Sequence, residues 1–181
     1  MKDVAIVSYC RTAIAKATRG ALNQTHGIPM AAHVLNGAVE RAGIEGGEVE
    51  AVVLGCGLPE GATGHNVARN AALWAGLSTG VPGLTVNRYC GSGVTAASIV
   101  ANRIAAGEMD VGIAGGVESI SLVQMNINLK GFFYEPLQPK MPAVRLSMNQ
   151  AAGYVPGQYD ISRDAPDSYC LKSPNPASHP S

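Results

Sequence analysis

The chain has 181 residues, of which 46% are hydrophobic, 14% charged and 5% aromatic. This composition is typical of a globular domain with its own core and excludes a disordered chain. Thirteen Lys and Arg residues balance thirteen Asp and Glu residues, so we expect neither a nucleic-acid surface nor an anionic-membrane surface. No apolar run approaches the ~18–20 residues that span a bilayer, so no membrane span is expected.

Four cysteines, at positions 10, 56, 90 and 170, form no C-x-x-C pair, and the four histidines are scattered. We therefore expect no metal site. The apolar start of the chain is short and suits a buried strand better than a signal peptide. Free thiols then favour a reducing compartment, most simply the cytoplasm.

The first two thirds of the chain alternate between two patterns. Short apolar runs predict buried strands at 4–9, 50–55, 83–87 and the start of 109–119. Apolar residues at helical spacing predict helices at 28–43, 65–76 and 91–107, each ending in a glycine. Strands that alternate with helices indicate an α/β layered fold, and their nearly continuous apolar character fits a sheet covered on both faces.

After Ser121 the periodicity fades. The stretch 122–145 carries three prolines and both phenylalanines, which predicts a long excursion loop. Weaker helix patterns follow at 148–159 and 162–173. Three further prolines after Ser173 predict a disordered end.

Cys90 lies between a predicted strand and a predicted helix, in the stretch VNRYCGSG at 86–93. The free N–H groups and the macrodipole of a helix N-terminus favour an anion such as a thiolate, so this thiol is expected to be reactive. Gly91 and Gly93 leave room for a bulky substrate, and the Cys90 backbone N–H is a candidate oxyanion donor. A small buried residue in a tight turn explains the spacing about equally well.

Two blocks of the sequence resemble the thiolases. VNRYCGSG, then a helix, then GGVESIS match the nucleophile segment of that family in order and spacing. Further matches are VAIVSYCRTAIAK and LGCGLPEGATGHNVARNAAL, and more weakly SMNQAAGYV and YDISRDAPDSYCLKS, so the resemblance covers residues 1 to about 173. It implies a thiolase-like N-terminal α/β domain, with a mixed sheet flanked by helices, and a partial CoA-binding loop domain.

By this resemblance, Cys90 is the nucleophile that accepts an acyl group from acyl-CoA as a thioester. The implied activity is that of an acetyl-CoA acetyltransferase or 3-ketoacyl-CoA thiolase, which forms or cleaves 3-ketoacyl-CoA such as acetoacetyl-CoA. Acyl-CoA and CoA are the implied substrates and partners, without a permanently bound cofactor or a metal. Full-length members are expected to be homo-oligomers, dimers or tetramers. Which residues contact CoA is left open.

Three family motifs are absent from these residues: a G-H-P histidine that activates the cysteine, a C-x-G cysteine, and an asparagine motif. After Ser173, the run PNPASHPS stands where the family continues a helix. We therefore expect a truncated or frame-shifted chain whose sheet lacks one strand. Its expected parts are an α/β domain at 1–119, a partial loop domain at 120–173 and an aberrant tail at 174–181. Such a chain alone is expected to be inactive, and a non-catalytic fragment or binding subunit is the alternative function.

Other positions carry weaker expectations. The GxG at 55–57 is a poor dinucleotide loop because Pro59 interrupts it, and the resemblance places it near the active site instead. His65 is expected to cap or pack at a helix start, and Glu118 to end a strand. Arg11 and Lys16 are expected to be surface or loop-anchoring charges. Core packing is favoured over a CoA-lining role for Met125, Phe132, Phe133 and Met148.

Overall fold

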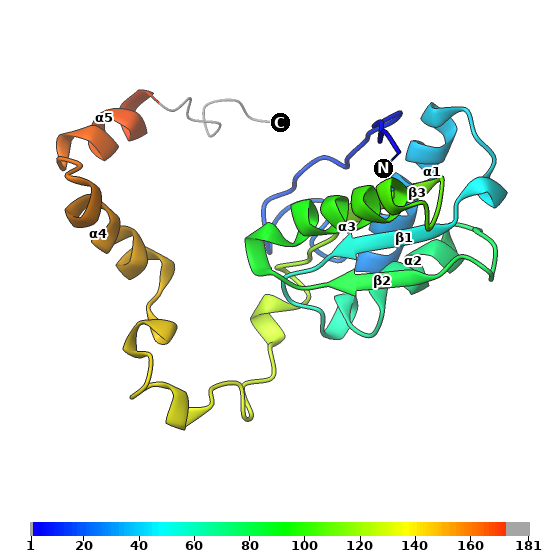
Figure 1. The fold of residues 1–181 in the computed structure, drawn as a ribbon. Coiled ribbons are helices and arrows are strands. Elements are labelled where there is room, and N and C mark those ends of the chain that lie inside the picture. Colours follow the sequence, from blue (N-terminus) through cyan, green and yellow to red (C-terminus); the bar gives the residue numbers. More distant parts are fainter. Residues whose placement is uncertain (1, 173–181) are drawn as a thin grey trace. The chain divides into compact units, whose positions relative to one another are not determined.

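The computed structural model describes residues 2–172 and divides the chain after Asn128 into two units, each described here by itself. The first unit holds a sheet of three strands, β1 (Ala51–Gly55), β2 (Gly83–Val86) and β3 (Gly112–Gly116), in the order β2-β1-β3 (Figure 1). Val52 of β1 is aligned with Gly83 on one side and with Ile113 on the other. All three strands are parallel, where a mixed sheet was expected.

Three helices connect and cover these strands: α1 (Gly27–Ala42), α2 (Val67–Trp74) and α3 (Ser92–Ala106). Side chains cap two of them, because His26 Nδ1 accepts a hydrogen bond from the Ile28 N–H and Asn66 Oδ1 accepts one from the Arg69 N–H. The cap of α2 is therefore Asn66, and His65, which was expected to cap or pack there, is exposed just before it and does neither. Gly43 and Gly107 end α1 and α3 with φ of 68° and 80°, a left-handed geometry that glycine adopts without strain.

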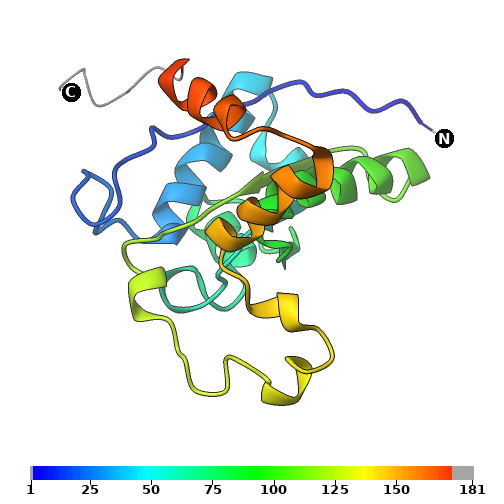
Figure 2. The same ribbon diagram turned by 90° about the vertical axis from the view of Figure 1, so that its left-hand side faces the viewer.

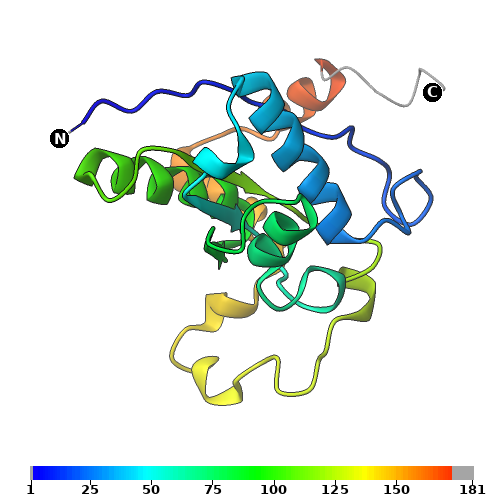
Figure 3. The same cartoon turned by 90° about the vertical axis from the view of Figure 1, so that its right-hand side faces the viewer.

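The two faces of the sheet are covered by different helices. Val52 and Leu54 pack among residues of α1 and α2, whereas Ala51 and Val53, on the other face, pack against α3. Figures 1 and 3 show the helices α1 and α2 on one side of the sheet and α3 on the other. All five residues of β1 are buried. This confirms the sequence interpretation of apolar strands in an α/β sheet that is covered on both faces.

The segment 4–9 is not the strand that its composition predicts. It runs as an extended trace without a strand partner (Figure 2), and Ile6 is 89% exposed. The segment is anchored at its two ends, where the Lys2 N–H donates to the Ala105 carbonyl and the Tyr9 carbonyl accepts from Arg41. A groove of about 700 Å³ lies between 4–12, α1, α3 and β3. Apolar composition alone does not make a strand, because backbone pairing with a neighbouring edge is also needed.

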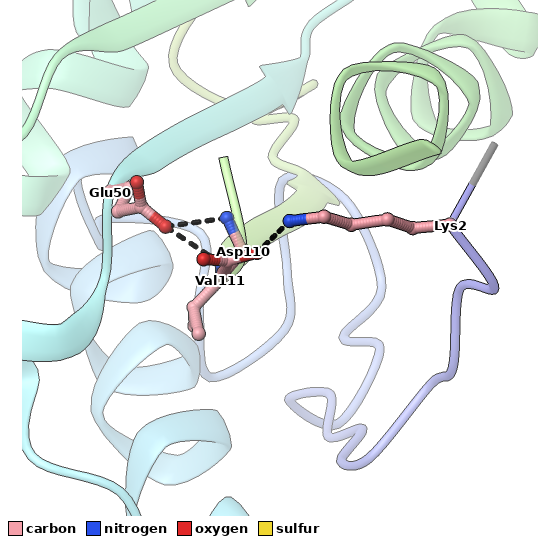
Figure 4. A network of polar contacts seen from close by, with 4 residues as sticks. All are labelled: Lys2, Glu50, Asp110 and Val111. Atoms are coloured by element: carbon pink, nitrogen blue, oxygen red, sulfur yellow. Dashed lines mark hydrogen bonds and ion pairs between the residues drawn. The ribbon is translucent and has the colours of Figure 1, made fainter. Parts of the chain in front are cut away.

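A small polar network lies where β1 begins (Figure 4). The Glu50 carboxylate accepts hydrogen bonds from the backbone N–H groups of Asp110 and Val111, at 2.6 and 3.0 Å. Lys2 forms an ion pair with Asp110 at 2.5 Å. The N–H of Asp110, followed by that of Val111, lowers the pKa of Glu50 below its usual value. The network therefore joins the start of β1 to the turn before β3.

Replacing Glu50 by glutamine should remove the pH-dependent part of the stability that the Glu50 carboxylate contributes. In the native chain the carboxylate stabilises the fold fully above the ordinary glutamate pKa, and this is lost as pH falls through the lowered pKa of the folded state. Glu50→Gln should therefore be less stable than the native chain at pH 7, and the gap should shrink on acidification. Urea unfolding between pH 7 and pH 3 measures this. A gap that stays constant over that range would contradict the assignment.

The second unit contains α4 (Met148–Tyr159) and α5 (Asp164–Lys172), close to both predicted helices. Ser147 and Gln150 form a reciprocal capping box at the start of α4. The preceding excursion has only 3₁₀ turns in its described length. Arg145 lies over the Phe133 ring at 4.9 Å and pairs with Glu135 at 3.0 Å.

Core packing of the apolar residues in the excursion is not observed. No residue between Leu129 and Lys172 is buried, and the four side chains expected to pack in a core are exposed: Met125, Phe132, Phe133 and Met148. The excursion forms only 3₁₀ turns, which present no continuous apolar face around which a core could form. No helix among residues 2–172 is both long and apolar enough to cross a membrane. The predicted disordered tail at 174–181 lies outside the described residues.

Candidate active site

Cys90 lies in the connection from β2 to α3, as the sequence predicts. It occupies the middle of a 3₁₀ turn, Tyr89–Gly91, and α3 begins two residues later at Ser92. The cysteine is exposed, which rules out a buried space-filling role for it. The thiol is thus presented to solvent at a helix N-terminus, where the free N–H groups favour an anion.

The turn before the thiol is held in an uncommon conformation. Tyr89 has a φ of 46°, in the left-handed region that bulky residues rarely adopt. The buried Ser92 hydroxyl fixes it, because Oγ accepts from the Arg88 N–H at 2.8 Å and donates to the Tyr89 carbonyl at 2.6 Å. Asn87 Oδ1 accepts from the Tyr89 N–H at 2.9 Å. Several hydrogen bonds therefore hold the residue next to Cys90 in place.

The end of β1 lies directly against this turn. A Cβ built on Gly55 would come within 2.4 Å of the Ser92 carbonyl carbon, so only glycine allows this approach of strand and helix. The helix after β1 covers one face of the sheet and the helix after β2 covers the other. In open α/β sheets, ligands bind outside the carboxyl ends of the strands. Cys90, after β2, and the loop after Gly55, at the end of β1, both lie at that edge of the sheet.

Glu118, two residues beyond β3, binds the loop that follows β1. Its Oε2 accepts a hydrogen bond from the Gly57 N–H at 2.7 Å, and its Oε1 accepts one from the Cys56 thiol at 3.6 Å. Burial raises the pKa of the Cys56 thiol. Cys56 is fully buried, whereas Cys90 is open to solvent, so the two neighbouring thiols differ sharply in accessibility.

Alkylation with iodoacetamide should rank the four thiols. Cys90 should react first and Cys56 last, because Cys56 is buried with a raised pKa. Cys170 is the matched control, since it is also exposed but lies in the last turn of α5, away from a helix N-terminus. We expect Cys90 to react about 3- to 30-fold faster than Cys170.

Trypsin places each cysteine in a different peptide, so mass spectrometry of timed digests measures all four rates together. Cys90 lies in the peptide 89–103 and Cys170 in the peptide 164–172. Equal rates for these two exposed thiols would show that the helix N-terminus does not activate Cys90.

The remaining residues singled out in the sequence are placed as follows. Arg11 is exposed and donates to the Thr12 carbonyl, which fits a loop-anchoring charge, and Lys16 is exposed. The GxG at 55–57 lies beside the Cys90 turn.

Sequence reasoning missed the roles of Ser92 and Glu118 in this turn. The signal for Ser92 was its place in the CGSG stretch, where a hydroxyl can bond back to the preceding backbone.

Comparison with known proteins identifies the family. The family model described as "Thiolase, N-terminal domain" matches residues 4–180. The chain belongs to the thiolase family. It is 37% identical to a 3-ketoacyl-CoA thiolase of Bacillus subtilis and 34% identical to an acetyl-CoA acetyltransferase of Cupriavidus necator. These matches cover 96% and 98% of this chain but only 44% and 47% of the two relatives.

A β-ketoadipyl-CoA thiolase of Pseudomonas putida is 35% identical over 96% of this chain and 47% of its own length. The chain therefore spans about half the length of these thiolase relatives. The matched half contains the strand, turn and helix that carry Cys90.

Proposed function

We propose that Cys90 of this thiolase-family chain accepts an acyl group from acyl-CoA. The observation that carries the proposal is the exposed thiol on a fixed turn at the N-terminus of α3, at the carboxyl end of the sheet. Relatives named 3-ketoacyl-CoA thiolase and acetyl-CoA acetyltransferase support an acyl-CoA substrate.

The proposed step is a thioester exchange. The Cys90 sulfur attacks the carbonyl carbon of acyl-CoA and forms a new C–S bond. The bond between that carbon and the CoA sulfur breaks, and CoA leaves with the proton that the Cys90 thiol has given up. The acyl group is then held as a thioester on Cys90, in the manner of covalent catalysis by an activated nucleophile. No redox change and no metal is involved in this balance.

Backbone geometry supports this step in two ways. The N-terminus of α3 and the Cys90 N–H are proposed to stabilise the negative charge on the oxygen of the tetrahedral intermediate. A Cβ built on Gly93 would meet nothing within 4 Å, so the space next to the thiol on this side is open. A substrate as large as an acyl thioester can therefore approach the sulfur.

A second function follows from the same geometry. Within residues 2–172, no side chain forms a hydrogen bond with the Cys90 sulfur, so no general base stands ready to take its proton. A positioned base typically contributes about 10²–10⁴-fold to a rate. We therefore propose slow, single acylation for these residues alone, while formation or cleavage of 3-ketoacyl-CoA is proposed for the longer thiolase architecture. A non-catalytic binding role remains the alternative.

Release of free CoA separates these functions. The chain is mixed with excess acetyl-CoA, the reaction is quenched, and free CoA is separated from the chain by chromatography before it is quantified, because the exchange leaves the total number of thiols unchanged. We expect CoA to reach a plateau at one equivalent per chain. Continued release of CoA beyond one equivalent, with formation of acetoacetyl-CoA, would contradict the absence of a base, and no CoA release at all would support the binding role.

A further inference from the structure

We propose that Glu118 is a positioning residue for Cys90, an inference that rests on Cys90 being the acyl acceptor. The Glu118 carboxylate forms no hydrogen bond with the Cys90 thiol. It fixes the loop after β1, and that loop supports the turn on which Cys90 is carried. Three carboxyl-terminal strand ends are joined in this way, because Glu118 follows β3, Gly57 follows β1 and Tyr89 follows β2.

The first link is between Glu118 and the loop. Gly57 is buried, and the Glu118 carboxylate is the acceptor for its backbone N–H at 2.7 Å. A buried N–H without an acceptor costs free energy, so the loop keeps this position only while the carboxylate is present. The Cys56 thiol, at 3.6 Å from the other carboxylate oxygen, gives the same group a second attachment to the same loop.

The second link is between the loop and the turn. The position that a Cβ would take on Gly57 lies 2.9 Å from Glu118 Oε2 and 3.6 Å from the Tyr89 Cα. The backbone of Gly57 therefore fills the space between the carboxylate and the strained residue before Cys90. Tyr89 holds a φ of 46° only while its surroundings enforce it. A shift of Gly57 away from Glu118 would remove one side of that support.

This arrangement distinguishes a positioning role from a purely electrostatic one. A purely electrostatic effect of a negative charge on thiol chemistry would be relieved when the charge is removed, so acylation would become faster. A positioning role predicts the opposite change in rate: loss of the carboxylate would let the turn move and would slow acylation. Glutamine keeps a carbonyl oxygen that accepts from the Gly57 N–H and removes the charge. Alanine removes both.

The experiment compares Glu118→Ala, Glu118→Gln and a control, Glu108→Ala, in the 181-residue chain. Glu108 is a suitable control because its carboxylate pairs with Arg103 on the exposed end of α3 and has the same charge. Acylation of Cys90 by acetyl-CoA and the melting temperature are measured for each. We expect Glu118→Ala to acylate about 10- to 100-fold more slowly, because a misplacement of about 1 Å has effects of this size.

Glu118→Gln should recover most of the rate, and Glu108→Ala should match the native chain. A native rate in Glu118→Ala would overturn the proposal, as would a faster rate, which would mark an electrostatic role. A slow Glu118→Gln with an unchanged melting temperature would also overturn it. If Glu118→Ala melts early, faster alkylation of Cys10, whose thiol donates to the Val34 carbonyl of α1 and not to this loop, would assign the effect to general unfolding and overturn the proposal. Failure of the native chain to acylate at Cys90 would instead refute the proposed function.

Discussion

Replacing Gly55 by alanine is expected to destabilise the first unit strongly. The new Cβ would lie 2.4–2.6 Å from three backbone atoms of Ser92 and Gly93. Backbone atoms cannot move aside by a rotamer change, so strand β1 and helix α3 would have to separate. Overpacking of a core typically costs about 1–3 kcal/mol, and we expect at least the upper end of that range here. Urea unfolding followed by circular dichroism measures it.

Gly93→Ala is the matched control for this substitution. Gly93 belongs to the same contact, but a Cβ built on it would meet nothing within 4 Å, and it lies inside α3. Alanine in a helix is more favourable than glycine by up to about 1 kcal/mol, so this variant should be as stable as the native chain or more so. Equal destabilisation by both substitutions would mean that the strand and the helix do not approach each other as described.

Replacing Cys90 by serine is expected to abolish acylation of the chain. A hydroxyl is a much weaker nucleophile than a thiol without an adjacent base, so we expect the rate of CoA release from acetyl-CoA to fall by on the order of 10³-fold or more. Stability should change little, because the side chain is exposed. CoA release and the urea midpoint are measured together.

Cys170→Ser serves as the control, since it removes an exposed thiol from α5. It should leave CoA release at the native rate. Undiminished release by Cys90→Ser would show that another residue receives the acyl group.

Much of the fold was predictable because local patterns coincide with the final packing. The alternation of apolar strands and amphipathic helices gave the α/β class, and glycines at the ends of α1 and α3 marked where those helices stop. The prediction of a strand at 4–9 was wrong, because an apolar pattern does not say which sheet edge the segment would pair with. The prediction of a mixed sheet was wrong for the described residues, in which all three strands are parallel.

The candidate nucleophile could be predicted from the sequence, whereas the residues that hold its turn in place could not. Cys90 was identifiable because a thiol between a strand and a glycine-rich helix start has a distinct local signal. Glu118 gave no such signal, because its partners Cys56 and Gly57 are about sixty positions away in the chain, and only the parallel sheet brings them together. Ser92 was hidden for another reason: a hydroxyl that bonds back to the turn looks in sequence like any polar residue at a helix start.

Locating the acyl group on the chain tests the role of Cys90 as the acceptor. The native chain is incubated with acetyl-CoA, quenched at low pH, digested with trypsin and analysed by mass spectrometry. Peptide 89–103 contains Cys90 as its only cysteine, and we expect one acetyl group on this peptide and none on those carrying Cys10, Cys56 or Cys170. An acetyl group on another cysteine, with peptide 89–103 unmodified, would contradict the assignment of Cys90 as the acyl acceptor.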